Sequence, residues 1–261
     1  MSPKLMGVVN VTPDSFSDGG RYLDADAAIA HGVELVRDGA EVLDVGGEST
    51  RPGAEPVGTE EELRRVEPVV AGLVGPATVS IDTSKAAVAA AAVDAGAEIV
   101  NDVTALRGDR EMAGLCAEHG VGVVLMHMPG DPLTMQDDPY YEDVVDEVKA
   151  FLAERVEVAV AAGIAEERIW LDPGIGFGKT LAHNLELLRR LGELRELGRP
   201  LVIGTSRKSF IGRIDGSEVG DRLGGTIASS VLAAAEGADV LRVHDVAETA
   251  QAIKVAEAVL G

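Results

Sequence analysis

The stretch that decides the fold is residues 5–20, LMGVVNVTPDSFSDGG, which reads as one buried strand followed by a polar loop. Its apolar run at residues 5–9 is long enough for a strand and ends at the polar residue Asn10. The loop carries two Asp, three hydroxyl groups and one aromatic residue, Phe16. Pro13 disfavours a helical start, and the closing Gly-Gly pair permits a turn with positive φ. Loops on rigid scaffolds often carry function, so we expect a functional loop here.

Similar strands return along the chain, each leading to a polar residue and then to a helical pattern. Three of them share one short motif, in which a helix ends at a Gly and a short buried strand follows, as in DGAEVLD at residues 38–44. The predicted strands are residues 5–9, 41–45, 78–81, 98–101, 122–126, 168–171, 201–203 and 239–242. The predicted helices are residues 24–38, 60–74, 85–95, 111–119, 140–162, 181–197, 222–235 and 247–260. Asp24 or Asp26 is expected to cap the first helix.

Eight strands alternating with eight helices predict a single (β/α)8 TIM barrel over residues 1–261, with its active site at the C-terminal ends of the strands. The length is close to the ~250 residues typical of this fold. A doubly wound open sheet is the alternative. It usually has fewer strands and a glycine fingerprint after the first strand, which this sequence lacks.

The chain is strongly acidic, with 44 acidic residues against 23 basic ones and a net charge of −21. This balance disfavours nucleic acid as a partner, because binding to phosphate backbones needs basic surface. Plain solubility and adaptation to high salt both remain open as explanations, and we lean towards the second. Because no apolar run is long enough to span a membrane and Cys116 has no second cysteine to pair with, we expect a cytoplasmic protein without membrane contact.

Polar residues that follow the strands gather, in a barrel, at one rim and form a candidate ligand site. They are Asn10, Asp82, Asn101, His127, Asp172, Lys208, Arg242 and His244. The carboxylates and amide of Asp82, Asn101 and Asp172 suit a flat heterocycle rich in N–H donors. Arg242 and His244, together with Arg51 in a loop, suit a phosphate group. Asn10 offers a neutral oxygen that can serve as a ligand for Mg²⁺ bridging a diphosphate.

Two further glycine-containing loops stand beside these strands. GGESTRPG at residues 46–53 is chemically similar to the first loop. DPGIGFGK at residues 172–179 lacks the spacing of a Walker A loop, and its glycines would let the backbone pass close to a flat ligand beside Phe177. Lys179 is expected to be a structural or helix-start residue. His31, His119 and His183 lie within or at the ends of predicted helices and are expected to be surface or capping residues, and no His, Cys and Glu spacing is typical of zinc.

At this point the sequence resembles the dihydropteroate synthases, the folate-pathway enzymes that are the target of sulfonamides. The resemblance covers nearly the whole chain. It is carried by NVTPDSFSDGG, GGESTRPG, SIDTSK at residues 80–85, NDV at 101–103, LMHM at 125–128, DPGIGFGK, GTSRKSFIG at 204–212 and RVHDV at 242–246. It implies condensation of 6-hydroxymethyl-7,8-dihydropterin diphosphate with p-aminobenzoate, with Mg²⁺ as cofactor and diphosphate as leaving group.

The resemblance also implies roles for particular residues. The pterin would be held by Asp82, Asn101, Met126, Asp172, Phe177 and Lys208, and the diphosphate by Asn10 through the metal and by Thr50, Arg51, Arg242 and His244. The p-aminobenzoate side would be formed by Phe16, Thr50, Arg51, Pro52, Lys208 and Ser209. The catalytic set would be Asp82, Lys208, Arg242, His244, Asp18 and Arg51, with Asp18 pairing with Arg51 across the two loops.

The sequence departs from the family in one respect, because members commonly carry a segment before the first strand and only four residues precede Leu5 here. We therefore expect stability or oligomer contacts to differ, and we expect a homodimer.

Two alternative functions stay open at this stage. A pterin-dependent methyltransferase domain shares the barrel and a similar central pocket but has no reason to keep both polar loops. A non-catalytic pterin-binding homologue should have lost loop residues.

Overall fold

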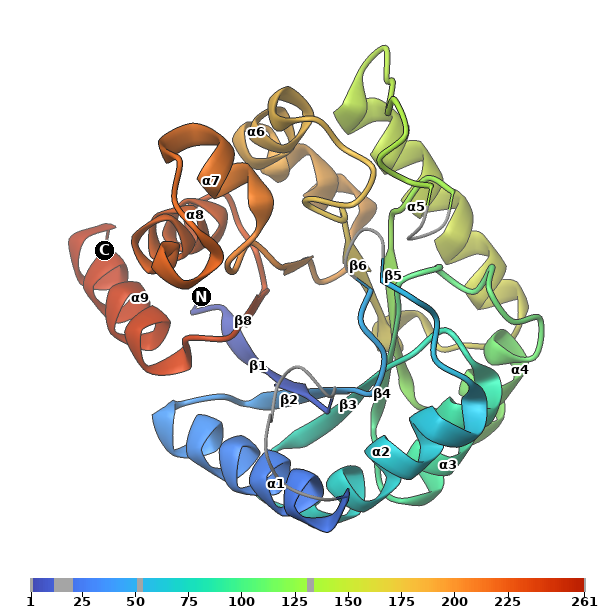
Figure 1. The fold of residues 1–261 in the computed structure, drawn as a ribbon. Coiled ribbons are helices and arrows are strands. Elements are labelled where there is room, and N and C mark those ends of the chain that lie inside the picture. Colours follow the sequence, from blue (N-terminus) through green and yellow to red (C-terminus); the bar gives the residue numbers. More distant parts are fainter. Residues whose placement is uncertain (1, 12–20, 51–53, 131–133, 261) are drawn as a thin grey trace.

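The computed structural model describes residues 2–11, 21–50, 54–130 and 134–260. Eight parallel strands form one sheet that curves into a barrel with helices around its outside (Figure 1). The strands are β1 (Lys4–Asn10), β2 (Val42–Gly46), β3 (Thr78–Asp82), β4 (Ile99–Asp102), β5 (Gly122–Met126), β6 (Ile169–Asp172), β7 (Val202–Ile203) and β8 (Val240–Val243).

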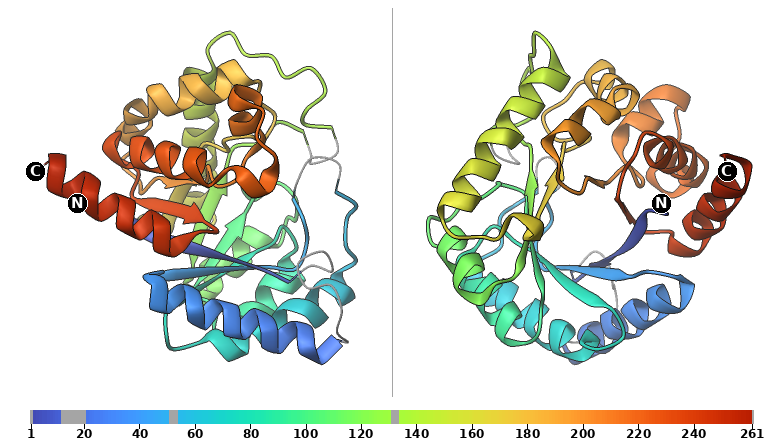
Figure 2. Two further views of the ribbon diagram at one scale, coloured as in Figure 1. Left: turned by 60° about the vertical axis from the view of Figure 1, so that its left-hand side comes forward. Right: turned by 180° about the vertical axis from the view of Figure 1, so that it is seen from behind.

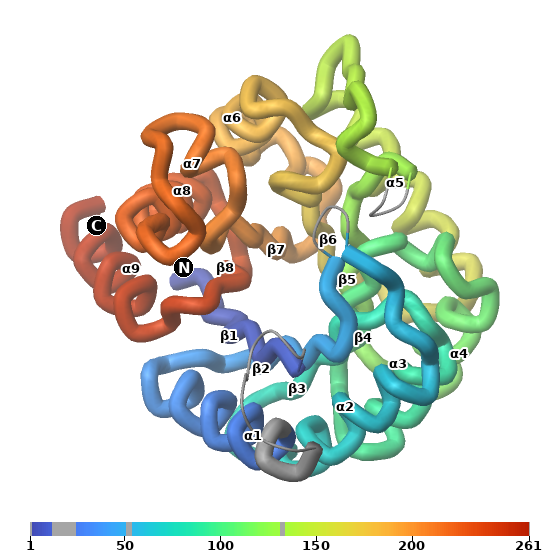
Figure 3. Tube along the Cα trace, in the orientation of Figure 1, coloured from blue at the N-terminus to red at the C-terminus, as the bar shows by residue number. Residues whose placement is uncertain are grey.

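The strand order is β6-β5-β4-β3-β2-β1-β8-β7, and an isolated bridge between Leu171 and Leu201 links the two edge strands. Figure 3 follows the chain once around this ring, from blue to red. Neighbouring strands in space are thus neighbours in sequence, as a barrel requires and a doubly wound sheet does not permit. The predicted (β/α)8 barrel is confirmed.

The helices cover the outer face of the barrel (Figure 2). They are α1 (Arg21–Asp38), α2 (Thr59–Leu73), α3 (Ala86–Asp94), α4 (Met112–His119), α5 (Val144–Ala161), α6 (Leu181–Arg189), α7 (Ser209–Asp215), α8 (Leu223–Ala235) and α9 (Val246–Leu260), with 3₁₀ turns at Glu166–Arg168, Leu191–Leu197 and Val219–Asp221. The last helix, α9, packs against α1 and α8 and closes the ring of helices. None of the helices among the described residues is long and apolar enough to cross a membrane.

Several helix boundaries differ from the prediction for local reasons. Helix α1 begins at Arg21, so both Asp24 and Asp26 lie inside it and neither is its cap. Helix α5 begins at Val144 instead of residue 140, because the Asp143 carboxylate accepts hydrogen bonds from two backbone N–H groups of the first turn. These differences leave the order of the elements unchanged.

The region after β6 also differs from the prediction. The single helix predicted over residues 181–197 is broken at Arg190, whose φ of −111° and ψ of 22° are not helical, and it continues as a 3₁₀ turn. Helix α7 was not predicted. It begins directly after Lys208, within the GTSRKSFIG stretch, and therefore places Lys208 at the N-terminal end of a helix.

The barrel interior changes from apolar to charged along its axis. Its N-terminal end is filled by a cluster of Met6, Val42, Ile99, Val124, Val202 and Val240, with Trp170 packed against it. Inward-facing side chains recur every second residue of a strand. Two residues beyond Val42, Ile99 and Val240 along their strands are Asp44, Asn101 and Arg242. Asp44 accepts hydrogen bonds from both of the others. An apolar plug therefore closes one end of the barrel, and a polar layer forms the floor of the other.

Candidate active site

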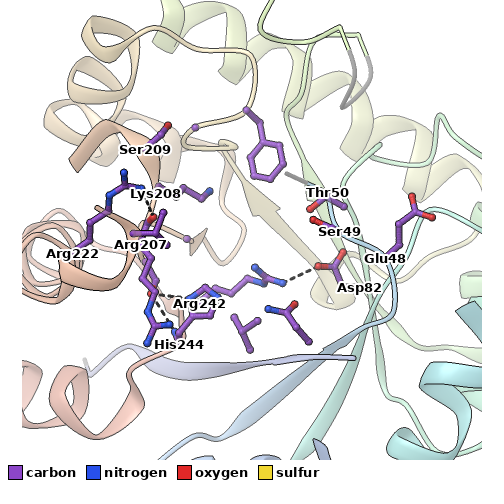
Figure 4. Close-up of a pocket in the computed structure, with 17 residues that line it drawn as sticks. Glu48, Ser49, Thr50, Asp82, Arg207, Lys208, Ser209, Arg222, Arg242 and His244 are labelled. Atoms are coloured by element: carbon purple, nitrogen blue, oxygen red, sulfur yellow. Dashed lines mark hydrogen bonds and ion pairs between the residues drawn. The ribbon is translucent and has the colours of Figure 1, made fainter. Parts of the chain in front are cut away.

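A cavity of about 380 Å³ opens at the C-terminal ends of the strands (Figure 4). Eight of the residues proposed from the sequence line it, namely Asn10, Thr50, Asp82, Phe177, Lys208, Ser209, Arg242 and His244. The other lining residues are Val8, Glu48, Ser49, Gly176, Gly204, Ser206, Arg207, Val219 and Arg222. The polar cavity therefore lies at the rim where the sequence predicts the site.

Arg242 on β8 is the centre of a charged network on the cavity floor. Its Nε donates to Asp44 Oδ2 at 2.6 Å, and its Nη2 donates to Asp82 Oδ2 at 2.8 Å. Asn101 Nδ2 donates to the same Asp44 oxygen at 3.0 Å. One fully buried carboxylate, Asp44, thus orients both the guanidinium of Arg242 and the amide of Asn101. The sequence reasoning missed Asp44, although a charged residue inside the apolar strand EVLDV was a usable signal.

Burial and the neighbouring charges shift the pKa values of the ionisable groups in this network. Burial raises the pKa of Asp82 from 3.8 to about 7, because the opposing charge of Arg242 does not outweigh burial and the like charge of Asp44. Burial alone would lower the pKa of Arg242, but the two carboxylates raise it above its ordinary value. Oδ1 of Asp44 and Oδ1 of Asp82 are buried and have no hydrogen-bond partner among the described residues. The Asp82 oxygen, in a residue that lines the cavity, is available to accept a donor from a bound ring.

Lys208 and Phe177 lie together at the upper wall of the cavity. Lys208 Nζ donates to the carbonyl oxygen of Ile175 and stands 4.6 Å from the centre of the Phe177 ring. Gly176 has a φ of +85°, which favours glycine, and a Cβ there would lie 3.1 Å from the Lys208 side chain. Burial lowers the pKa of Lys208 to about 8, with the nearby Asp172 opposing this shift. An ammonium group over an aromatic ring suits stacking against a flat ligand.

His244 stands at the end of β8, next to Ser206. Its Nδ1 lies 3.0 Å from Ser206 Oγ, and its backbone N–H donates to the same oxygen at 3.2 Å. Figure 4 shows His244 and Arg242 side by side on the cavity floor. The hydroxyl of Ser206 therefore fixes the orientation of the imidazole ring. Sequence reasoning did not single out Ser206, because one serine in GTSRKS carries no distinguishing pattern.

Three residues predicted to bind the pterin do not line this cavity in the structure. Asn101 lies below it, bound to Asp44. Asp172 is buried, accepts a hydrogen bond from the Gly174 N–H at 2.7 Å, and has a pKa raised by burial. Met126 packs with Val103, Met128 and Met135, and Phe177 packs against this cluster. Their proposed contacts with a pterin stay predictions.

His127 was expected among the polar rim residues of the site, and the structure corrects this. Its ring contacts Phe151 edge-on at 4.9 Å between centroids, and Nδ1 lies 3.0 Å from Lys179 Nζ. It directly follows Met126, so the alternation along the strand turns the two side chains to opposite faces. Burial lowers the pKa of His127 to about 2, so the ring is neutral and structural.

Lys179 is structural, as predicted, but it does not start a helix. It is 1% exposed, and besides His127 its Nζ contacts the Phe177 carbonyl oxygen at 2.9 Å. Thr180 is the residue that caps α6, and His183 completes a capping box with it, which confirms the expected capping role of His183. Phe16, Asp18, Arg51 and Pro52 lie outside the described residues.

Asn10 is the residue proposed to bind a metal ion. It ends β1 and lines the cavity. Among the described residues there is no group of three or more His, Cys, Asp or Glu that could hold a metal ion. The neutral amide oxygen of Asn10 is a donor of the kind that Mg²⁺ accepts, because Mg²⁺ is commonly bound by one or two protein oxygens together with substrate phosphates and waters.

A barrel rim that joins buried carboxylates, an arginine paired with two of them, a histidine and a lysine over an aromatic ring defines an enzyme-type site for a flat, nitrogen-rich ring that carries phosphate. The model of the family described as "Pterin binding enzyme" matches residues 6–244. A dihydropteroate synthase of Escherichia coli strain K12 is 48% identical over 262 residues, which cover 99% of this chain and 92% of that protein.

Two solved structures are similar over their whole length. The dihydropteroate synthase of Xanthomonas albilineans with 4-aminobenzoic acid has a TM-score of 0.94 and 51% identity, covering 100% of this chain and 94% of that one. A Yersinia pestis dihydropteroate synthase in a sulfonamide drug complex has a TM-score of 0.94 and 46% identity, covering 99% and 94%. The chain therefore belongs to the pterin binding enzymes and, within them, to the dihydropteroate synthase family.

Proposed function

We propose that this chain is an enzyme that condenses 6-hydroxymethyl-7,8-dihydropterin diphosphate with p-aminobenzoate to give 7,8-dihydropteroate and diphosphate. Family membership and the names of the relatives support this reaction. The observation in the structure that carries it is the Arg242 network, which places a half-buried cation between two buried carboxylates on the floor of the cavity. This arrangement can serve both ends of a pterin diphosphate.

The carboxylates would bind the pterin ring. Asp82 has an unpartnered buried oxygen, and a carboxylate accepts hydrogen bonds from ring N–H and amino groups. Asn101 and Asp172 lie deeper and would contact the ring once it enters the barrel mouth. Lys208 and Phe177 would cover the face of the ring. The ionised carboxylate of Asp82 is the form that accepts these hydrogen bonds. Binding of the ring at pH values below about 7 would therefore be accompanied by release of the Asp82 proton.

Arg242 and His244 would bind the diphosphate, and the charge of Arg242 would stabilise its departure. Arg242 is in β8, His244 directly follows that strand, and both line the cavity. The C–O bond to the diphosphate breaks first, and its electron pair leaves with the diphosphate, whose growing charge Arg242 stabilises. The positive charge left on the pterin is spread over the ring and is stabilised by Asp82 and Asp172. The amine of p-aminobenzoate then attacks the exocyclic carbon and loses a proton.

We propose Mg²⁺ as the cofactor, held on the protein side by Asn10 and otherwise by the diphosphate. When bound, it would supply charge neutralisation for the leaving diphosphate. The single neutral oxygen of Asn10 supports this assignment, because such a site needs the substrate to complete it. Metal affinity is therefore expected to depend on diphosphate.

The p-aminobenzoate would bind at the upper end of the cavity, where Thr50 and Ser209 approach from opposite sides (Figure 4). Ser209 is the first residue of α7, so its backbone N–H points out of a helix N-terminus, which favours a carboxylate. Phe16, Arg51 and Pro52 would complete this side, with Asp18 pairing with Arg51. A sulfonamide, which the Yersinia pestis relative binds, is expected to compete here with p-aminobenzoate.

We further propose that the protein is a cytoplasmic homodimer. Cys116 is a buried free thiol whose pKa burial raises to about 12, which is compatible with a reducing compartment. Large apolar side chains are exposed on the neighbouring helices α8 and α9, among them Leu232, Val255 and Val259. Sedimentation equilibrium tests the dimer, and a single species at about 27 kDa would contradict it.

Release of diphosphate from the pterin substrate, measured with and without p-aminobenzoate in the presence of Mg²⁺, tests the proposed function. We expect steady release only when both substrates are present. A pterin-dependent methyltransferase would instead transfer methyl from a methylated folate, and a non-catalytic homologue would bind pterin without releasing diphosphate. Either result would overturn the proposal.

A further inference from the structure

A partly buried ion cluster lies beside the cavity and includes residues that the proposed reaction does not use. Lys85 Nζ lies 2.5 Å from Glu48 Oε2 and 2.5 Å from Glu62 Oε2. The three residues come from different segments, since Glu48 follows β2, Glu62 is in α2, and Lys85 precedes α3 at the end of the SIDTSK stretch. One lysine therefore joins three parts of the barrel wall.

Glu62 is the most deeply buried residue of the cluster. The Glu62 side chain is 1% exposed, and besides Lys85 it accepts a hydrogen bond from the Thr83 hydroxyl at 2.7 Å. Burial opposes the charge of Lys85, but its hydrogen bonds to the two carboxylates outweigh burial and raise its pKa above the ordinary value. Lys85 thus stays charged, and without it Glu62 would be a buried carboxylate with no cation beside it.

Glu48 connects this cluster to the cavity. Its Oε2 also accepts a hydrogen bond from the Val57 N–H at 2.9 Å, which holds residue 57 next to residue 48. Arg65 from α2 donates to the Gly47 carbonyl oxygen at 2.8 Å. The two residues after Glu48 are Ser49 and Thr50, and all three line the cavity on the side opposite Lys208 (Figure 4).

We propose that Lys85 is a positioning residue, which acts through Glu48 to hold Ser49 and Thr50 at the p-aminobenzoate end of the cavity. The proposal rests on the proposed function for the identity of the substrate. The pterin end is built from β3 and β8, whose Asp82 and Arg242 pair with each other and, among the described residues, form no ion pair with Lys85. Loss of Lys85 should therefore affect the two substrates unequally.

Four variants separate this role from general stability. Lys85→Met removes the charge and keeps an unbranched side chain, whereas Lys85→Arg keeps a cation that can reach both carboxylates. The double variant Lys85→Met with Glu62→Gln removes the uncompensated buried charge if the single variant fails to fold. Lys149→Met is the matched control. Lys149 forms an ion pair of the same length, 2.5 Å, with Glu196 and does not line the cavity.

The steady-state constants for each substrate form the first measurement. In Lys85→Met, or in the double variant, we expect the KM for p-aminobenzoate to rise at least tenfold. The affinity for the pterin diphosphate should change less than threefold. Lys85→Arg should restore the KM to within threefold of the unmutated protein, and Lys149→Met should change neither constant. Equal losses for both substrates, or no change for either, would overturn the proposal.

Hydrogen exchange of the Val57 amide forms the second measurement, and it needs no substrate. We expect this amide to exchange at least tenfold faster in the Lys85→Met or double variant and at the unmutated rate in Lys149→Met. Unchanged exchange would overturn the positioning role. If the unmutated protein turned over neither substrate, the proposed function would fail, while the exchange result would still decide whether Lys85 holds this segment.

Discussion

Replacing Asp82 by Asn tests the electrostatics of the cavity floor in the free protein. The pKa of Asp82 lies at about 7 in the folded protein and at 3.8 when unperturbed, because burial and Asp44 disfavour its charge more than Arg242 favours it. Between these values the folded state holds a proton that the unfolded state has released. The free energy of unfolding therefore falls as pH rises through this window, and the loss is complete above about pH 7.

The magnitude follows from this difference in pKa. Between pH 5.5 and pH 8 the folded carboxyl loses its proton while the unfolded one is already ionised, which corresponds to about 2 kcal/mol at about 1.4 kcal/mol per pKa unit. An amide mimics the protonated acid and does not titrate. The difference in unfolding free energy between Asp82→Asn and the unmutated protein should thus grow by about 2 kcal/mol, in favour of the variant, over this range.

Urea unfolding of both proteins at several pH values provides the assay. Comparison of the two removes the contributions of all other groups, including the general repulsion of a chain with a net charge of −21. Asp109→Asn is the matched control, because its backbone hydrogen bonds from Glu111 and Ala86 lower the pKa of Asp109. Its effect should not vary between pH 5.5 and pH 8. A constant difference for Asp82→Asn, or one that shrinks as pH rises, would refute the reasoning.

Three further predictions concern ligands and salt. Asp172→Asn should weaken pterin binding by roughly 1.5–3 kcal/mol, because one charge-assisted hydrogen bond is lost in a buried site, and calorimetric affinity within threefold of the unmutated protein would exclude the role. If the acidity is an adaptation to salt, the melting temperature should rise steadily with KCl towards molar concentration, whereas a flat or falling curve would favour plain solubility. p-Aminobenzoate should bind measurably only after Mg²⁺ and diphosphate are added, since Arg51 and Asn10 gain partners from them, and Arg51→Ala should lose this coupling but keep its pterin affinity. Equal affinity of the unmutated protein in both conditions would contradict a site assembled by the leaving group.

Most of the fold followed from the sequence because each βα unit carries its own signals. The apolar strands, the glycine at a helix end and the polar residue after the strand recur at every unit, so their order alone defines a barrel. The break at Arg190 and the short helix after Lys208 were missed because a single turn is decided by packing against its neighbours, which periodicity does not reveal.

The location of the site could be predicted from the sequence, but the contacts among its side chains could be predicted only in part. The rim position followed from parallel strands, whereas the side to which a residue turns depends on where its strand ends. His127 lies one residue past β5 and faces the helices, and Asp44 lies two residues before the end of β2 and faces the barrel axis. The partnership of Arg242 with Asp44 joins residues 198 positions apart, and no local pattern encodes it.

The central claim is that this rim joins a pterin diphosphate to p-aminobenzoate, and a single-turnover experiment measures it most directly. Purified protein in excess over the pterin substrate is mixed with Mg²⁺ and p-aminobenzoate, and 7,8-dihydropteroate and diphosphate are quantified over time. We expect both products to appear in equal amounts and at the same rate, and Arg242→Met to slow them together by at least a hundredfold, or about 2.7 kcal/mol. Diphosphate without dihydropteroate, or an unchanged rate in Arg242→Met, would contradict this claim.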